Sequence, residues 1–190
     1  SEDNIRSGRT DPGDDEMPAI LKFDGAEPDR SATKLSDPQD YNRVEHAYNR
    51  MARDVGIEMP EIRALERDGY YHLLIPRFDL REASTRLHQH TLGGLLHIDY
   101  NNPGAGSYED YFQSILDLGM DYSDLREGYR RMIFNILAIN QDDHVKNLSF
   151  HMDPNGDWSL VPAYDVTFAY ESGATRKPQM TLRGKQEYME

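Results

Sequence analysis

Residues 140–147 read Asn-Gln-Asp-Asp-His-Val-Lys-Asn, and residues 162–166 read Pro-Ala-Tyr-Asp-Val. Two short apolar segments, 148–152 and 158–162, lie between these polar stretches and flank an Asp-Pro-Asn-Gly turn, which predicts a β-hairpin. A hairpin brings its two ends side by side. Because Asn147 precedes the first strand and Asp165 follows the second, the two side chains are expected to share one metal ion.

The spacing of these polar residues fits phosphoryl transfer. That chemistry needs a carboxylate beside the attacking hydroxyl, oxygen ligands for Mg²⁺ and a cation on the phosphates. Asp142 lies five residues before Asn147, a spacing that protein kinases also use together with a later metal-binding Asp. Lys22 on the apolar stretch 19–23 and Glu45 on a predicted helix fit a phosphate-binding Lys held by a helical Glu. The sequence therefore predicts a kinase-like site.

Other interpretations of the same residues stay open at this point. Polar loop residues often satisfy only backbone groups. Asp142, Asp143 and His144 are alternatively a transition-metal site, although three adjacent residues reach one ion only with a distorted backbone. His88 and His90 alternate around Gln89, so on a strand they would face one way, as ligands or as ordinary surface residues.

The order of predicted elements indicates an α+β fold with two lobes. A strand at 19–23, a helix capped by Asp37 and ended by Gly56, and a hairpin over 62–75 form a small β-rich lobe. Helices are predicted at 91–98, 108–118 and 123–139, ahead of the acidic loop and its hairpin. We expect the lobes to span residues 1–78 and 79–190. The first helix carries apolar residues at spacings of three and four, and this face is expected to be buried: Tyr41, Val44, Tyr48, Met51 and Val55.

Composition excludes several classes of protein. The chain has 21 basic and 34 acidic residues, a formal net charge of −13, so direct binding to nucleic acid is not expected. No apolar run approaches the roughly 18–20 residues that span a bilayer. Cysteine is absent, which excludes disulfides and thiolate metal sites. A cytoplasmic protein without membrane contacts is expected.

The two polar motifs at residues 140–147 and 162–166 resemble the signature of the HipA toxin kinases. Shorter segments are similar to the same family in the same order, and the resemblance covers about residues 18–186: Ile20-Leu21-Lys22-Phe23, the helix around Glu45, Arg77-Phe78-Asp79, Leu87-His88 and Pro178-Gln179-Met180-Thr181-Leu182.

The resemblance implies a role for each matching residue. It implies an ATP- and Mg²⁺-dependent Ser/Thr protein kinase in which Asp142 is the catalytic base. The other implied roles are metal binding by Asn147 and Asp165, phosphate binding by Lys22 with Glu45, adenine contacts at the hinge residues Pro76 and Phe78, and catalytic-loop functions for His144 and Lys146. Known family members act on protein substrates, including an aminoacyl-tRNA synthetase, and pair with a DNA-binding antitoxin of the HipB type.

Two departures from the family pattern bear on activity. The family has a Gly-rich phosphate loop before the strand of Lys22, whereas Gly8 and Gly13 are isolated here. Family members also continue with helices beyond the segment around Met180. The chain is therefore expected to be a fragment, incomplete at both ends, that binds ATP poorly by itself. The alternatives are a small-molecule kinase of similar architecture and a non-catalytic antitoxin-binding module.

Overall fold

The computed structural model describes residues 16–25, 40–81, 85–170 and 174–187. These residues form several small sheets and four α-helices, so the predicted α+β class is confirmed. None of the helices among these ranges is long and apolar enough to cross a membrane.

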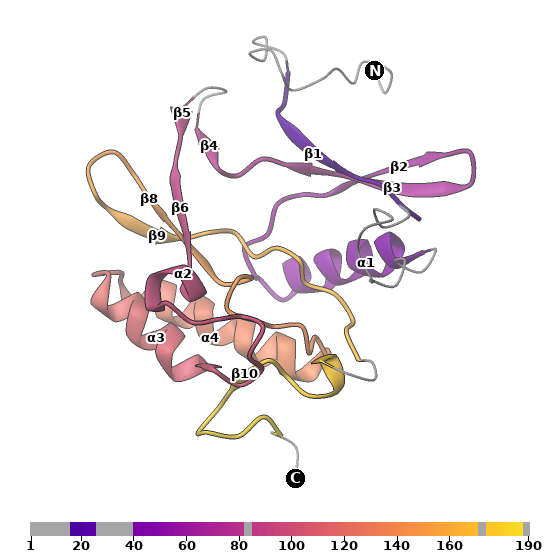
Figure 1. Ribbon diagram of the computed structural model, residues 1–190. Helices are drawn as coiled ribbons and strands as arrows, with labels where there is room; N and C mark the ends of the chain where they lie inside the picture. The colour runs from indigo at the N-terminus through magenta and orange to yellow at the C-terminus, as the bar shows by residue number, and fades with distance from the viewer. Residues whose placement is uncertain (1–15, 26–39, 82–84, 171–173, 188–190) are drawn as a thin grey trace.

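The first sheet has the strand order β1-β3-β2, and all of its pairs are antiparallel. Its strands are β1 (Ala19–Lys22), β2 (Arg63–Arg67) and β3 (Tyr70–Pro76). Asp68 and Gly69 form the predicted turn between β2 and β3, and both have the positive φ that a tight hairpin turn requires. Helix α1 (Tyr41–Asp54) lies along this sheet (Figure 1).

The prediction for the buried face of α1 is wrong. Val44, Met51 and Val55 are 37%, 47% and 55% exposed. The helix instead buries a mostly polar face: Asn42, Glu45, Asn49 and Ala52. Asn42 and Asn49 donate hydrogen bonds from their side chains to backbone carbonyls of neighbouring segments, which offsets the cost of burying them. Asp40 precedes the helix without a side-chain cap, and the predicted cap Asp37 lies outside the described residues.

The second three-stranded sheet has the order β6-β8-β9 and contains the predicted hairpin. Its strands are β6 (His88–Thr91), β8 (Ser149–Met152) and β9 (Trp158–Leu160). Two smaller pairs complete the β structure. They are the antiparallel β4 (Leu80–Arg81) with β5 (Thr85–Arg86), and the parallel β7 (Gly106–Ser107) with β10 (Met180–Thr181).

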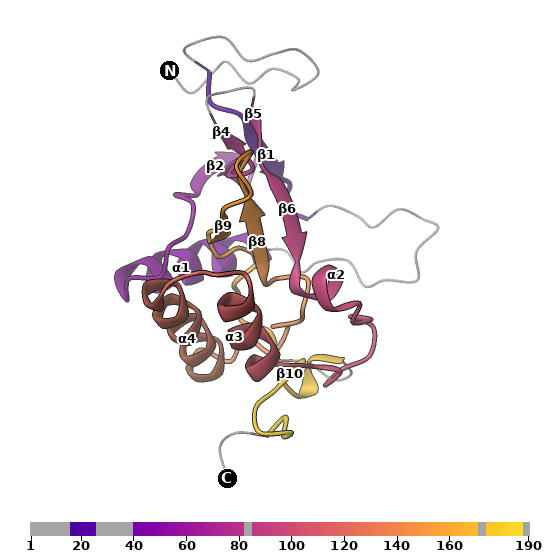
Figure 2. The same cartoon turned by 90° about the vertical axis from the view of Figure 1, so that its left-hand side faces the viewer.

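Three helices follow β6 and pack beneath the second sheet. They are α2 (Leu92–Leu96), α3 (Tyr108–Asp117) and α4 (Tyr122–Leu137), and α3 and α4 lie side by side in both views (Figures 1 and 2). Ser107 and Asp121 each begin a helix with a complete capping box. The main core lies between these helices and β8, around Leu92, Tyr108, Tyr111, Ile115 and Phe150, all fully buried.

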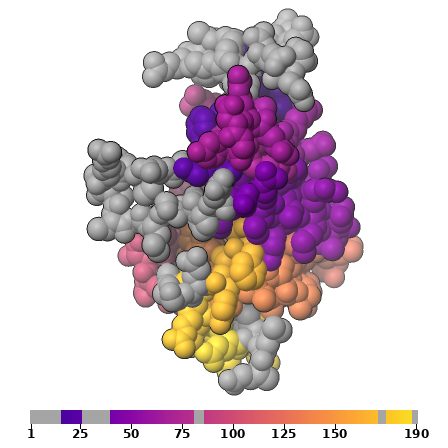
Figure 3. Space-filling model, turned by 90° about the vertical axis from the view of Figure 1, so that its right-hand side faces the viewer, coloured from indigo at the N-terminus to yellow at the C-terminus, as the bar shows by residue number. Residues whose placement is uncertain are grey.

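A second, smaller core cluster joins α1 to α4. It contains Ala52 of α1, Phe134 of α4, and Ala163 and Val166 from the segment after β9. The hydroxyl of Tyr48 also donates to the carbonyl of Ala138 at 2.6 Å. Figure 3 shows α1 and the first sheet gathered above the residues of the C-terminal half. The polar loop of residues 140–147 lies where these two parts meet.

The polar loop is held by close packing around Val145, which is 3% exposed. A Cβ atom on Gly106 would collide with Val145 Cγ1 and lie 3.2 Å from Met180 Sδ. A Cβ atom on Gly93 would lie 2.8 Å from Val145 Cγ2. Two glycines from different segments therefore make room for one side chain of the loop.

We predict that Gly106→Ala lowers the free energy of unfolding by about 1–3 kcal/mol, because the added methyl overpacks this contact. Chemical denaturation of the wild type and variant measures the change. Combining Gly106→Ala with Val145→Ala removes the collision, so the double variant is expected to be less destabilised than the sum of the single variants. A purely additive result contradicts the packing argument.

Candidate active site

Seven of the nine predicted site residues line one cavity of about 580 Å³ between the first sheet, α1 and the polar loop. The described residues that line it come from five separate parts of the chain: Lys22, Tyr41, Glu45, Thr91, Asp142, His144, Lys146, Asn147, Tyr164, Asp165 and Thr167. Tyr41, Thr91 and Thr167 were not predicted as site residues: the sequence marks Tyr41 only as part of an apolar helix face, and it does not mark the two threonines.

Lys22 and Glu45 form an ion pair, with Nζ and Oε2 2.5 Å apart. The Lys22 side chain is 31% exposed, whereas that of Glu45 is 3% exposed. Burial alone would lower the pKa of Lys22, but the carboxylates of Glu45 and Asp165 outweigh it, so this pKa lies above its ordinary value. Lys22 is thus a cation at physiological pH, with its ammonium held between Glu45 of α1 and Asp165 of the segment after β9.

A hydrogen bond within the polar loop fixes the orientation of the Asn147 side-chain amide. Asn147 Nδ2 donates to the backbone carbonyl of Asp142 at 2.9 Å, which fixes the amide and leaves Oδ1 as its acceptor atom. The nearest carboxylate oxygen of Asp142 lies 3.9 Å from His144 Nε2, too far for a hydrogen bond. The Asp142 side chain is 46% exposed and lines the cavity.

Asp165 is positioned by the backbone and by its neighbour Tyr164. Its φ of 51° lies in the left-handed region, which Asp tolerates better than most residues. Asp165 Oδ1 is 3.7 Å from Lys22 Nζ. The Tyr164 hydroxyl donates to the carbonyl of Lys146 at 2.5 Å and contacts Ser149 Oγ at 2.6 Å. Tyr164 thereby ties the segment of Asp165 to the polar loop.

These residues fit a magnesium ion. Mg²⁺ takes oxygen ligands and usually binds through one or two protein groups together with phosphates and water. Asn147 Oδ1 and the half-exposed Asp165 carboxylate supply such oxygens on the same cavity. Among the described residues no three His, Cys, Asp or Glu side chains form a metal cluster, so a transition-metal site is not favoured.

Pro76 and Phe78, the predicted hinge residues, are not among the described residues that line the cavity. Pro76 ends β3 opposite Ala19, and Phe78 follows it. The ring of Phe78 stacks on that of Tyr164, with centroids 5.6 Å apart. Phe78 thus contacts a residue of the cavity rather than the cavity itself, and an adenine contact by either residue stays a prediction.

Asp143 lies on the opposite side of the loop from the cavity. It is 3% exposed and accepts hydrogen bonds from the Tyr108 hydroxyl at 2.6 Å and from the backbone N–H groups of Gln179 and Met180 at 2.8 and 3.4 Å. Burial raises the pKa of Asp143, and these donors oppose that effect. The alternative in which Asp142, Asp143 and His144 share one metal is therefore wrong, because Asp143 does not line their cavity.

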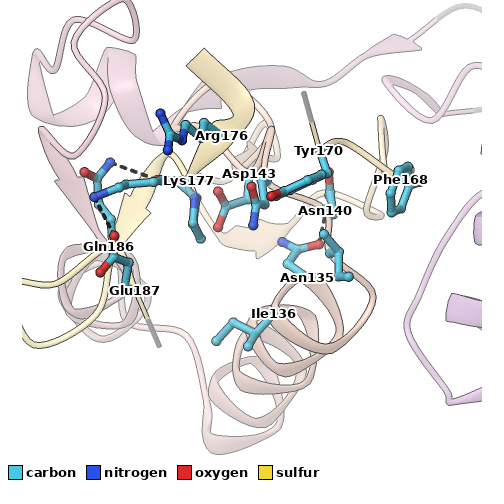
Figure 4. Close-up of a pocket in the computed structure, with 13 residues that line it drawn as sticks. Asn135, Ile136, Asn140, Asp143, Phe168, Tyr170, Arg176, Lys177, Gln186 and Glu187 are labelled. Carbon is cyan, nitrogen blue, oxygen red and sulfur yellow. Dashed lines mark hydrogen bonds and ion pairs between the residues drawn. The ribbon is translucent and has the colours of Figure 1, made fainter. Parts of the chain in front are cut away.

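A second cavity of about 430 Å³ lies beyond Asp143, at the C-terminal end of α4 (Figure 4). Its lining includes Asn135 and Asn140, which are joined by a hydrogen bond, and the ion pair of Lys177 with Glu187. It holds none of the predicted catalytic or metal-binding residues.

His88 and His90 do face the same way on β6, with ring centroids 5.7 Å apart. No third metal-ligating side chain joins them among the described residues. His88 also packs edge-on against Trp158. These contacts favour ordinary surface residues.

A model of the HipA-like C-terminal domain matches residues 4–190. The chain belongs to the HipA-like C-terminal domain family. The match covers almost the whole chain, and it includes both polar motifs from which the site was predicted.

Two curated relatives of this HipA-like chain carry kinase names. A Haemophilus influenzae protein named "Putative kinase" is 31% identical over 134 residues, which are 64% of this chain and 39% of that protein. "Putative kinase Y4mE" of Sinorhizobium fredii is 27% identical over 145 residues, 70% of this chain and 34% of that protein. The matched part of this chain therefore corresponds to between one third and two fifths of the length of these relatives.

The fold also matches a solved structure, the Shewanella oneidensis MR-1 HipA in a complex with HipB and its operator DNA. The TM-score is 0.69 at 21% sequence identity, over 80% of this chain and 40% of that one. HipA has a kinase-like fold, and this HipA-like chain shares it.

We predict that Tyr108→Phe lowers the free energy of unfolding by about 1–3 kcal/mol, because it removes a donor from a buried carboxylate. The Tyr108 hydroxyl also accepts from Asn135 Nδ2 at 3.2 Å, so a second buried group loses its partner. Chemical denaturation measures the loss. Tyr129→Phe on α4, where the side chain is 55% exposed, is the control and should change stability little. If both variants change the free energy of unfolding equally, the hydrogen bonds of the Tyr108 hydroxyl with Asp143 and Asn135 do not stabilise the fold.

Proposed function

We propose that this chain carries the catalytic site of an ATP- and Mg²⁺-dependent protein Ser/Thr kinase of the HipA toxin type. The observation that carries the proposal is the meeting of Lys22, Glu45, Asp142, Asn147 and Asp165 on one cavity. They come from β1, α1, the polar loop and the segment after β9. Kinases use this set of a Lys–Glu pair, a catalytic Asp and two metal ligands for phosphoryl transfer.

Each residue takes one part of the proposed reaction. Asp142 accepts the proton of the attacking Ser or Thr hydroxyl. Asn147 Oδ1 and the Asp165 carboxylate would hold Mg²⁺, which neutralises charge on the phosphates when bound. Lys22 binds the ATP phosphates, and Glu45 holds its ammonium in place. Lys146 and His144 at the cavity stabilise charge on the transferred phosphoryl group.

The wider role follows from the family. We propose a cytoplasmic protein that modifies a protein hydroxyl, with an aminoacyl-tRNA synthetase as the first substrate to test. The absence of cysteine suits that compartment. The natural protein is proposed to pair with a DNA-binding antitoxin of the HipB type, and the solved HipA neighbour was crystallised with HipB. The net charge of −13 favours DNA contacts through that partner rather than through this chain.

The first test removes the proposed base. Asp142→Ala in the full-length protein should lower transfer of the ATP γ-phosphate to protein by about 10²- to 10⁴-fold, the usual contribution of a general base. Asp157→Ala, at an exposed hairpin turn, is the matched control and should keep wild-type activity.

Phosphoproteomics of cells that express the wild type or Asp142→Ala then identifies the substrate. Phosphate on Ser and Thr of proteins, lost in the variant, supports the proposal. Transfer only to small molecules supports the small-molecule kinase instead. No transfer by either form, together with antitoxin binding, supports the non-catalytic module.

A further prediction concerns ATP binding. Lys22→Met should raise the KM for ATP by about 10- to 100-fold, because a charge-assisted hydrogen bond contributes roughly 1.5–3 kcal/mol. Steady-state kinetics of the full-length protein measure this. Lys177→Met removes a similar ion pair, with Glu187 at 2.5 Å, outside the cavity and should leave the KM unchanged. Equal KM values for Lys22→Met and wild type would remove Lys22 from the phosphate site.

A further inference from the structure

The ammonium of Lys146 lies on the face of an aromatic ring. Lys146 Nζ is 3.2 Å from the centroid of the Tyr100 ring, well inside the roughly 6 Å at which a cation and a ring attract each other. Lys146 is an exposed residue, and its stem has four rotatable bonds. The ring restricts where this otherwise mobile cation lies.

Tyr100 also contacts a second residue of the polar loop. Its ring meets that of His144 at 71°, with centroids 5.7 Å apart. His144 and Lys146 both line the cavity, whereas Tyr100 is not among the described residues that line it. Tyr100 thus contacts two residues that line the cavity, His144 and Lys146, and the proposed function uses both of them.

The segment that carries Tyr100 is itself attached to the polar loop. The Gly93 N–H donates to the carbonyl of Val145 at 3.0 Å, and the Ile98 N–H donates to the carbonyl of Gly93 at 2.8 Å. Asp99 then accepts from the backbone and side chain of Asn101. These bonds place the Tyr100 ring at a defined position relative to the residue before Lys146.

A carboxylate beside the ring supports the same placement. The pKa of Asp99 is held below its ordinary value by the hydrogen bonds from Asn101 and, to a smaller extent, by the charge of Lys146. Lys146 therefore lies near both the Tyr100 ring and the Asp99 carboxylate, which are neighbours in the sequence.

We propose that Tyr100 is a positioning residue that holds the ammonium of Lys146 at the edge of the cavity for phosphoryl transfer. The inference rests on the proposed function. A lysine that is held near its working position loses less conformational freedom when charge develops on the transferred phosphoryl group. The ring face supplies that restraint, and the Tyr100 hydroxyl is not required for it.

The test compares two substitutions in the full-length protein. Tyr100→Phe keeps the ring face and should keep wild-type kinetics. Tyr100→Leu removes the ring and should lower kcat by about two- to fivefold, the range expected for an exposed cation–ring contact, with little change in the KM for ATP. Because Tyr100 is 38% exposed, both variants are expected to fold, and thermal unfolding checks this.

A double-mutant cycle separates positioning from a general structural effect. In a Lys146→Met background, Tyr100→Leu should have no further effect on kcat, since the cation it restrains is gone. A loss of equal size in both backgrounds overturns the inference, as does an equal loss in Tyr100→Phe. Asp142→Ala is assayed alongside: full activity of that variant contradicts the proposed function, whereas the cycle reports on Tyr100 alone.

Discussion

A single buried carboxylate determines where the polar loop lies. Asp143 has almost no contact with solvent, and a carboxylate without water needs several donors to remain in the interior. Its donors come from α3, through Tyr108, and from the start of β10, through two backbone N–H groups. These hydrogen bonds fix the loop at Asp143 to α3 and to the C-terminal segment.

This anchoring gives the two sides of the loop different properties. On the inner side Asp143 and Val145 are buried, and Val145 packs against two glycines. The outer side carries Asp142, His144 and Lys146 into an open, polar cavity, where the Lys22–Glu45 pair meets them from the other part of the molecule. Rigid support behind charged side chains is the arrangement that a precise binding site needs.

Sequence reasoning located the hairpins, the later helices and most of the cavity residues, because these depend on turn residues and local spacing. It did not predict the buried face of α1, since the contacts that favour Asn42 and Glu45 over Val44 and Met51 come from β1 and β3. The roles of Asp143 and Tyr100 were also missed. Their partners are distant in the sequence, and no periodic pattern links them.

The parallel pairing of β7 with β10 has a consequence for biosynthesis. Gly106 and Met180 are paired although they lie far apart in the chain, and two of the donors to Asp143 belong to the β10 side. Contacts of this kind form late, because a long loop must close first. On the ribosome, α3 and α4 can pack while the polar loop still lacks its anchor. The loop can reach its final arrangement only after residue 180 has left the exit tunnel, so a nascent chain would pass through a stage in which the helices are ordered and the polar loop is not yet anchored.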